Sequence, residues 1–321
     1  MMRGAMDLRV VAGTDLRVSR LILGTMTFGA QVAEREAEEM VDLALDAGIT
    51  MFDTAAVYVD GASEEILGAI LKRKKSDALV ATKVHPNPEG LSKPAIFRAI
   101  DASLRRLQRE YVDLYYLHSP DRQTPIEESL DAMAELVRAG KIRHAGVSNY
   151  AAWQICDIRH RSAARGWPVV TFSQQMYNLV ARRLEEEYAS FSDSVQLFDV
   201  VYNPLAGGLL TAKHALGSTP VPGSRFSQEQ YRGRYWNEQQ FHAVERLGDA
   251  ARAEGLTLVE LALRWLLTRP LVDAVLIGAS TVDQLRSNLS AAEGGALSVG
   301  LIQLCDDVWR ELRGVAPGYN R

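Results

Sequence analysis

The 321-residue chain has 47% hydrophobic and 24% charged residues, a composition typical of a globular protein with a large buried core. Its formal net charge of -4 supplies no basic surface for nucleic acid, and it has neither a signal-peptide core nor an apolar run long enough to span a bilayer. Cys156 and Cys305 form no CxxC or metal-ligand spacing and fit a reducing compartment, so we expect a cytoplasmic protein without nucleic-acid or membrane partners.

The N-terminal region predicts a hairpin followed by a strand, a helix and a second strand. Residues 8–11 and 16–18 flank a Gly-Thr-Asp turn, and such a hairpin is suited to plug the bottom of a barrel. Residues 21–24 form the first barrel strand. A helix follows over about 33–47, and residues 49–53 form the second strand.

The middle of the chain alternates between helical and strand patterns. Ser63 is placed to open the second helix, and Ser92 to cap the third. The predicted helices here cover 63–72, 92–108, 125–140, 151–165 and 184–192, and the predicted strands cover 78–83, 112–118, 142–148, 169–174 and 196–202.

The C-terminal third contains a long segment rich in Gly, Pro and Ser, residues 203–236, before the pattern resumes. That segment is too long for an idle loop. Helices are expected at 238–253, 258–268, 281–291 and 300–313, the eighth strand at 274–277, and an irregular tail at the end. Eight strand-helix units predict an α/β protein whose residues 1–321 form a single (β/α)8 TIM barrel domain.

Polar side chains stand where three successive predicted strands end. Asp53 and Tyr58 follow the second strand, Lys83 ends the third, and His118 ends the fourth. In isolation, Asp53 would be a turn cap and Tyr58 a packing residue. Because the carboxyl ends of parallel barrel strands meet at one face, we instead expect these four side chains to gather there.

These residues resemble the catalytic tetrad of the aldo-keto reductases. Further motifs follow in that family's order, namely Gly-Val-Ser-Asn at 146–149, Asn-Pro-Leu-Ala-Gly-Gly at 203–208 and Gly-Ala-Ser-Thr at 278–281. The chain has no Gly-x-Gly, so a Rossmann turn is excluded. Residues 117–121, 148–153, 175–178 and 231–236 are similar to the aflatoxin-aldehyde (succinic-semialdehyde) reductase branch.

The resemblance implies reduction of an aldehyde or ketone by NADPH, with Tyr58 as proton donor. The ammonium of Lys83 is expected to lower the pKa of Tyr58, and Asp53 to keep Lys83 charged. His118 is expected to donate to the substrate oxygen.

The resemblance also implies two sets of binding residues. The NADPH/NADP+ contacts would be Asp53, Ser148, Asn149, Gln174, Tyr202, Asn203, Pro204, Leu205, Gly207, Leu209, Lys213, Arg225, Gly278, Ser280, Thr281, Gln284 and Asn288. The substrate contacts would be Met26, His118, Tyr231, Arg234 and Arg321. Ser280 or Thr281 also fits as a simple helix cap, and Arg234 and Arg321 also fit as solvated surface arginines.

The chain departs from the branch in two places. Its tail reads Gly-Tyr-Asn-Arg, and the stretch before Arg225 is shorter.

Other interpretations of the function remain open. A metal-dependent barrel enzyme would need clustered histidines and carboxylates, and the remaining histidines, His85 included, show no such spacing, so no metal is expected. An NADPH-binding regulatory barrel resembling potassium-channel β subunits is the other alternative. Either a monomer or a homodimer is expected. Trp153, Trp265 and Trp309 are expected to pack within helices, and Trp236 to pack or to form a pocket wall.

Overall fold

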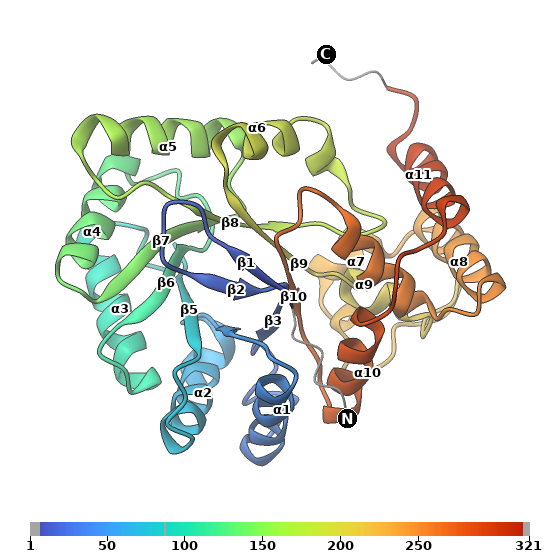
Figure 1. The fold of residues 1–321 in the computed structure, drawn as a ribbon, viewed down its shortest axis with the longest axis horizontal. Helices are drawn as coiled ribbons and strands as arrows, with labels where there is room; N and C mark the ends of the chain where they lie inside the picture. Colours follow the sequence, from blue (N-terminus) through green and yellow to red (C-terminus); the bar gives the residue numbers. More distant parts are fainter. Residues whose placement is uncertain (1–6, 87, 317–321) are drawn as a thin grey trace.

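Eight parallel strands close into a barrel in the computed structural model, which describes residues 7–86 and 88–316 (Figure 1). The strands are β3 (Leu21–Gly24), β4 (Met51–Asp53), β5 (Leu79–Val84), β6 (Val112–Leu117), β7 (Ile142–Ser148), β8 (Phe172–Met176), β9 (Phe198–Tyr202) and β10 (Ala274–Ile277). Each strand pairs with the next along the chain, and β10 pairs with β3 to close the ring. The predicted (β/α)8 barrel is confirmed.

Helices surround the barrel and cover its outer face (Figure 1). They are α1 (Glu34–Asp46), α2 (Ala62–Arg73), α3 (Lys93–Leu107), α4 (Ile126–Arg138), α5 (Ala152–Arg165), α6 (Tyr188–Val195), α7 (Glu229–Tyr235), α8 (Glu238–Ala253), α9 (Leu258–Thr268), α10 (Val282–Ala292) and α11 (Val299–Arg313). Each main helix buries an apolar stripe against the strands; in α3 the buried positions include Ile96, Ile100 and Leu104, as their spacing predicts. Within the described part of the chain, no helix is both long and apolar enough to cross a membrane.

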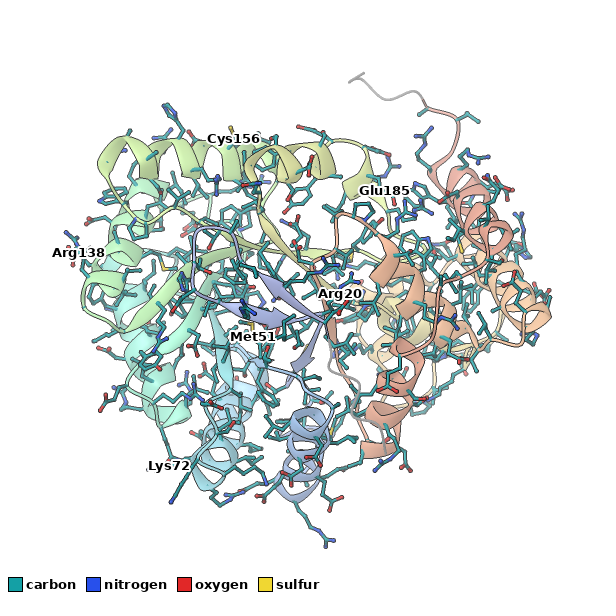
Figure 2. All side chains as sticks on the ribbon, viewed as in Figure 1. Arg20, Met51, Lys72, Arg138, Cys156 and Glu185 are labelled. Carbon is teal, nitrogen blue, oxygen red and sulfur yellow. The ribbon has the colours of Figure 1, made fainter. Side chains whose placement is uncertain are left out.

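A two-stranded hairpin packs against the inner face of the barrel. Strands β1 (Leu8–Val10) and β2 (Arg17–Ser19) pair antiparallel, and Val11, Leu16 and Val18 are buried against inward-facing strand residues such as Met51. In Figure 1 the hairpin lies across the ring of strands, and Figure 2 shows Met51 near the middle of that ring. The hairpin therefore covers the amino-terminal end of the barrel, as the sequence predicts, and leaves the carboxyl ends of the strands for a site.

The segment between β9 and α8 is structured. It forms the short 3-10 helices η3 (Ala206–Thr211) and η4 (Arg225–Ser227) and then α7. It returns to the loop after β3, where the side chain of Gln31 donates to the main-chain oxygen of Gly223 at 2.9 Å. This segment therefore crosses the carboxyl end of the barrel.

Several local predictions are wrong. Ser63 lies inside α2, where its hydroxyl bonds to Thr25 and Thr54, and Gly61 precedes the helix at a φ of 94°. Ser92 occupies the N-cap position of α3 but makes no capping hydrogen bond.

Several element boundaries and one tryptophan also differ from prediction, and two boundary differences are the largest. Strand β8 begins three residues later than expected, and the expected helix over 184–192 is divided into η2 (Arg183–Glu185) and α6. Trp153 is 68% exposed and does not pack in the core, whereas Trp265 is fully buried as predicted. Helical periodicity does not reveal which face of a helix meets the barrel when the helix is only half covered.

Candidate active site

A buried ion pair lies beneath Tyr58 at the carboxyl ends of β4 and β5. Lys83 is fully buried, donates to Oδ1 of Asp53, and donates at 2.7 Å to the main-chain oxygen of Thr54. The Lys83 ammonium lies 5.1 Å from the centroid of the Tyr58 ring, which belongs to η1 (Tyr58–Gly61). The second carboxylate oxygen of Asp53 accepts at 2.9 Å from the amide of Gln174 on β8. The barrel thus brings together groups from three strands.

The protonation of Tyr58 reflects opposing effects. Burial raises the pKa of Tyr58, the positive charge of Lys83 lowers it, Asp53 raises it again, and the net direction is upward. Lys83 acts in the expected direction, but the net shift is upward, because the expectation left out the removal of the hydroxyl from water and the charge of Asp53. Tyr58 keeps its proton at neutral pH, which is the form that a proton donor requires.

Lys83 behaves as expected. Burial is the largest single effect and lowers the pKa of Lys83, but Asp53 and Tyr58 together outweigh it, and the net pKa is raised. A buried amine paired in this way remains an ammonium. Lys83 therefore supplies a fixed positive charge next to the Tyr58 hydroxyl.

His118 follows β6 and faces Tyr58, with ring centroids 5.9 Å apart and planes at 80°. Burial lowers the pKa of His118 to about 3, and the charge of Lys83 adds to this effect. The imidazole is consequently neutral at pH 7 and carries one N–H donor. Its Nδ1 atom is buried and has no hydrogen-bond partner among the described residues.

A cavity of about 910 Å³ opens over Tyr58 and His118. It extends past the carboxyl ends of β7 to β10, where Ser148, Tyr202 and Ile277 line it. This volume lies at the upper end of the range of ~300–1,000 Å³ for small-molecule sites. The cavity therefore has room for a ligand much larger than a short aldehyde.

Comparison with known proteins identifies the family. The model of the Aldo/keto reductase family matches residues 20–310. Aflatoxin B1 aldehyde reductase member 2 of Mus musculus is 37% identical over 333 residues, covering 98% of this chain and 90% of the relative. The chain belongs to the aldo/keto reductase family. It is an oxidoreductase, and the predicted family and branch are confirmed.

Two further relatives of this reductase are informative. Human aldo-keto reductase family 7 member A3 is 36% identical over 320 residues, covering 94% of this chain and 96% of the relative. The probable voltage-gated potassium channel subunit beta of Oryza sativa subsp. japonica is 34% identical over 304 residues, covering 90% of this chain and 92% of the relative. The reductase therefore shares its family with proteins named for catalysis and with one named for a channel.

Most residues predicted to contact the cofactor line the cavity of the reductase. Those lining it are Asp53, Ser148, Asn149, Gln174, Tyr202, Asn203, Pro204, Leu205, Gly207, Lys213, Arg225, Gly278, Ser280, Gln284 and Asn288. Two do not line it. Leu209 is buried in the core, and Thr281 caps α10 by accepting at 3.2 Å from the main-chain nitrogen of Gln284.

Several of these side chains are linked to one another. The Asn149 amide donates to the main-chain oxygen of His118 at 2.9 Å and accepts from the Tyr202 hydroxyl at 2.7 Å. Gln284 Oε1 accepts from the main-chain nitrogen and the hydroxyl of Ser280, at 3.0 and 2.9 Å. These bonds hold the cavity walls in place.

The loop after β9 presents its backbone to the cavity. Gly207 and Gly208 have φ angles of 70° and 104°, which favour glycine, and a Cβ atom on Gly207 would lie 2.8 Å from the Tyr231 ring. Ser224 and His214 also line the cavity, and among the described residues Ser224 Oγ and His214 Nδ1 are buried without a partner. The wall therefore offers unused polar groups and room for close backbone approach.

The predicted substrate residues gather at the mouth. Met26, Tyr231 and Arg234 line the cavity. Arg225, predicted to contact the cofactor, donates at 2.6 Å to the Tyr231 hydroxyl and reaches Met26 Sδ at 3.4 Å. Arg321 lies outside the described residues.

His85 is a cavity residue that was not predicted from the sequence. It lines the cavity and lies edge-on to His118, with ring centroids 5.4 Å apart. The sequence did contain a signal for this placement, because His85 stands two residues after Lys83 and alternate strand residues share a face.

Trp236 is a packing residue, and its ring centroid lies 4.9 Å from that of Phe226. Among the described residues no three His, Cys, Asp or Glu side chains are grouped to hold a metal ion.

Proposed function

We propose that this chain reduces aldehydes to alcohols with NADPH, and that Tyr58 donates the proton. The observation that supports this most is the protonated Tyr58 above the buried Lys83–Asp53 pair, opening into a cavity beside neutral His118. Carbonyl reduction needs a hydride at carbon and a proton at oxygen. The relatives named aflatoxin B1 aldehyde reductase support an aldehyde as the carbonyl compound.

In the proton step, the carbonyl oxygen lies between Tyr58 and His118. His118 donates its N–H to that oxygen and orients it, and Tyr58 gives up its proton as negative charge develops. The Lys83 ammonium stabilises the resulting phenolate, while Asp53 keeps Lys83 charged. General acid catalysis of this kind contributes roughly 10²–10⁴-fold to the rate.

The cavity wall fits a dinucleotide, whose nicotinamide ring supplies the hydride when bound. Tyr202 offers a ring face for stacking, and Ser148 and Asn149 offer hydrogen-bonding groups for the carboxamide. The positive-φ glycines 207 and 208 allow close approach to phosphate oxygens, and Lys213 supplies a counter-charge. The unpartnered Ser224 hydroxyl adds a donor in the same wall.

A preference for NADPH over NADH is part of the proposal. Ser280 and the amino terminus of α10 border the cavity and suit a phosphate. Gln284 lines the cavity beside Ser280 without carrying a charge, and Arg286 is close in sequence. Donors without a cation still favour the extra phosphate, but less strongly than an arginine would.

The proposed substrates are short aldehydes with a remote carboxylate, such as succinic semialdehyde or 2-carboxybenzaldehyde. Tyr231 and Arg234 line the mouth, and the Arg234 guanidinium lies 5.9 Å from the Tyr231 ring centroid. A guanidinium presents a planar pair of donors that matches a carboxylate. We propose that Arg234 and Arg321 anchor that carboxylate.

Replacing Tyr58 with phenylalanine tests the acid role. Tyr58→Phe keeps the ring and removes the proton, so aldehyde reduction should fall by ~10²-fold or more while NADPH binding survives. The measurements are NADPH and NADH oxidation against an aldehyde panel, and cofactor titration by quenching of intrinsic fluorescence. Near-parental turnover by Tyr58→Phe would contradict the role of Tyr58 as the acid. In the parent protein, NADH binding that equals or exceeds NADPH binding in affinity would contradict the cofactor preference.

A regulatory role is the second candidate, supported by the rice relative named as a channel β subunit. A barrel of that kind would bind NADPH with little turnover. Steady aldehyde reduction by the purified chain without a partner favours the enzyme. Tight NADPH binding without turnover of any panel member favours the regulatory protein.

A further inference from the structure

The turn that carries Tyr58 has an unusual backbone. Val59 and Asp60 have φ angles of 50° and 53°, and Gly61 has a φ angle of 94°. Left-handed conformations are uncommon in residues other than glycine, and they are strained in a β-branched residue such as Val59. Such strain persists only where surrounding contacts hold the backbone. Contacts outside the turn must therefore keep Tyr58 in place.

Helix α2 begins directly after this turn and is bonded to it. The main-chain nitrogen of Ala62 donates to the main-chain oxygens of Tyr58 and Val59. The side chain of Arg106 packs closely against the other side of the turn, since a Cβ atom on Gly61 would lie 2.8 Å from it. The position of Tyr58 therefore depends on the position of the first turn of α2.

Glu64 lies in the first turn of α2, and its fully buried side chain holds that turn from two directions. Its Oε1 accepts from the Thr82 hydroxyl at 2.5 Å, and its Oε2 accepts from Nε of Arg106 at 2.6 Å. A buried carboxylate is held firmly by such bonds, because leaving it unpaired is costly. Thr82 immediately precedes Lys83 in β5, whereas Arg106 belongs to α3. The Glu64 carboxylate thus ties the turn that carries Tyr58 to the strand that carries Lys83.

Building on the proposed reductase function, we propose that Glu64 is a positioning residue that sets the distance between the Tyr58 hydroxyl and the Lys83 ammonium. Glu64 is not among the residues that line the cavity, so it acts on the reaction through these two side chains. Proton donation requires the phenol to meet the carbonyl oxygen in a defined geometry, and a misplacement of ~1 Å can cost ~10²-fold in rate. Loss of the Glu64 bonds should therefore slow proton donation and leave ligand binding intact.

Thr82→Val tests the link between α2 and β5 in the full-length protein. Valine keeps the branched shape of threonine and suits a strand, but it lacks the hydroxyl that donates to Glu64. We expect the single-turnover rate of aldehyde reduction by bound NADPH to fall about tenfold, because Tyr58 is no longer held against Lys83. The KM for the aldehyde and the Kd for NADPH should change by less than about twofold, because uniform binding is unaffected.

Two substitutions of Glu64 separate its hydrogen bonds from its charge. Glu64→Leu removes both bonds and should lower the single-turnover rate about 100-fold. Glu64→Gln loses the charge, but its amide can still accept from Arg106 and donate to the Thr82 hydroxyl. The rate of Glu64→Gln should therefore recover most of the loss, and a rate as low as that of Glu64→Leu would overturn the proposal.

Ser192→Ala is the matched control. The Ser192 hydroxyl also donates to a buried carboxylate, that of Asp199, and links helix α6 to strand β9 at the amino-terminal end of the barrel. Its single-turnover rate should equal that of the parent.

A parental rate in Thr82→Val would overturn the proposal, even if Glu64→Leu does not fold. An equal loss of rate in Ser192→Ala would also overturn it, as would a loss of NADPH binding as large as the loss of rate. If the parent reduces no aldehyde, the reductase function itself fails, and the role of Glu64 fails with it.

Discussion

Tyr58, Lys83 and Asp53 show how burial and charge compete at single side chains. Burial acts against the charged form of every group, so it raises the pKa of Tyr58 and opposes the charge on Lys83. For Lys83 the effects of Asp53 and Tyr58 together reverse the outcome, whereas for Tyr58 the carboxylate of Asp53 adds to the effect of burial because it destabilises a phenolate. The site therefore rests with a protonated phenol beside a protonated amine.

Arg234 should matter more for charged substrates than for neutral ones. Removing one charge-assisted contact to a carboxylate costs ~1.5–3 kcal/mol, so Arg234→Ala should lower kcat/KM for succinic semialdehyde ~10–100-fold more than for butanal. Steady-state kinetics with both aldehydes measures this difference. Equal losses for the two substrates would mean that Arg234 holds the loop or the fold and does not anchor a carboxylate.

At the scale of elements, helices α2 and α3 approach each other closely. Gly68 of α2 is buried, and a Cβ atom there would lie 2.5 Å from main-chain atoms of Leu107 at the end of α3. The contact is with backbone, which cannot rotate away as a side chain can. Glycine at this position therefore sets the spacing between α2 and α3.

Gly68→Ala should force α2 and α3 apart and lower the free energy of unfolding by ~1–3 kcal/mol. Gly248→Ala on α8 is the matched control, since its Cβ would meet only the flexible end of Arg252 at 3.4 Å. That variant should gain ~0.5–1 kcal/mol because alanine favours a helix. Denaturant unfolding measures both, and a Gly68→Ala protein as stable as the parent would contradict the close approach.

At the scale of the whole molecule, the amino-terminal end of the barrel, opposite the cavity, holds a buried carboxyl group. At the amino-terminal end, buried Asp199 accepts from the Tyr188 hydroxyl at 2.6 Å and from the Ser192 hydroxyl, and its main-chain nitrogen donates to Asp273. Burial raises the pKa of Asp199 to about 7, and Asp273 adds to the rise. An unfolded aspartate titrates near ~3.9, so folding favours the protonated carboxyl.

The raised pKa of Asp199 makes the free energy of unfolding depend on pH. Because its folded pKa lies above the unfolded one, the stability that Asp199 contributes is fully present below about pH 4 and is lost as the pH rises through about 7. The amide that the variant Asp199→Asn introduces cannot ionise. The free energy of unfolding of this variant, relative to that of the parent, should therefore be ~3 kcal/mol higher at pH 8 than at pH 5. Chemical denaturation at both pH values measures this, with exposed Asp193→Asn on α6 as the control for a lost charge. Parallel pH dependence in Asp199→Asn and the parent would contradict the prediction.

Short-range sequence patterns determined most of the architecture. The bounds of β7, α9 and β10 agree with those predicted, because apolar spacing and adjacent turn residues specify a strand or helix without reference to distant parts of the chain. Asp53, Lys83 and His118 could be predicted as neighbours because parallel strands in a barrel all end at one face. Eight strand-helix units in sequence already require that geometry.

Only the tertiary structure decided how those residues behave. The raised pKa of Tyr58 depends on its burial and on Asp53 lying next to Lys83, and neither property is visible in sequence spacing. The closeness of His85 to His118 depends on the register between β5 and β6, which is set when the ring closes. The inward turn of Ser63 and the exposure of Trp153 likewise depend on how far each helix is covered by its neighbours. Local patterns fix the conformation of a segment, but distances between segments, and therefore charge interactions and burial, arise only from packing.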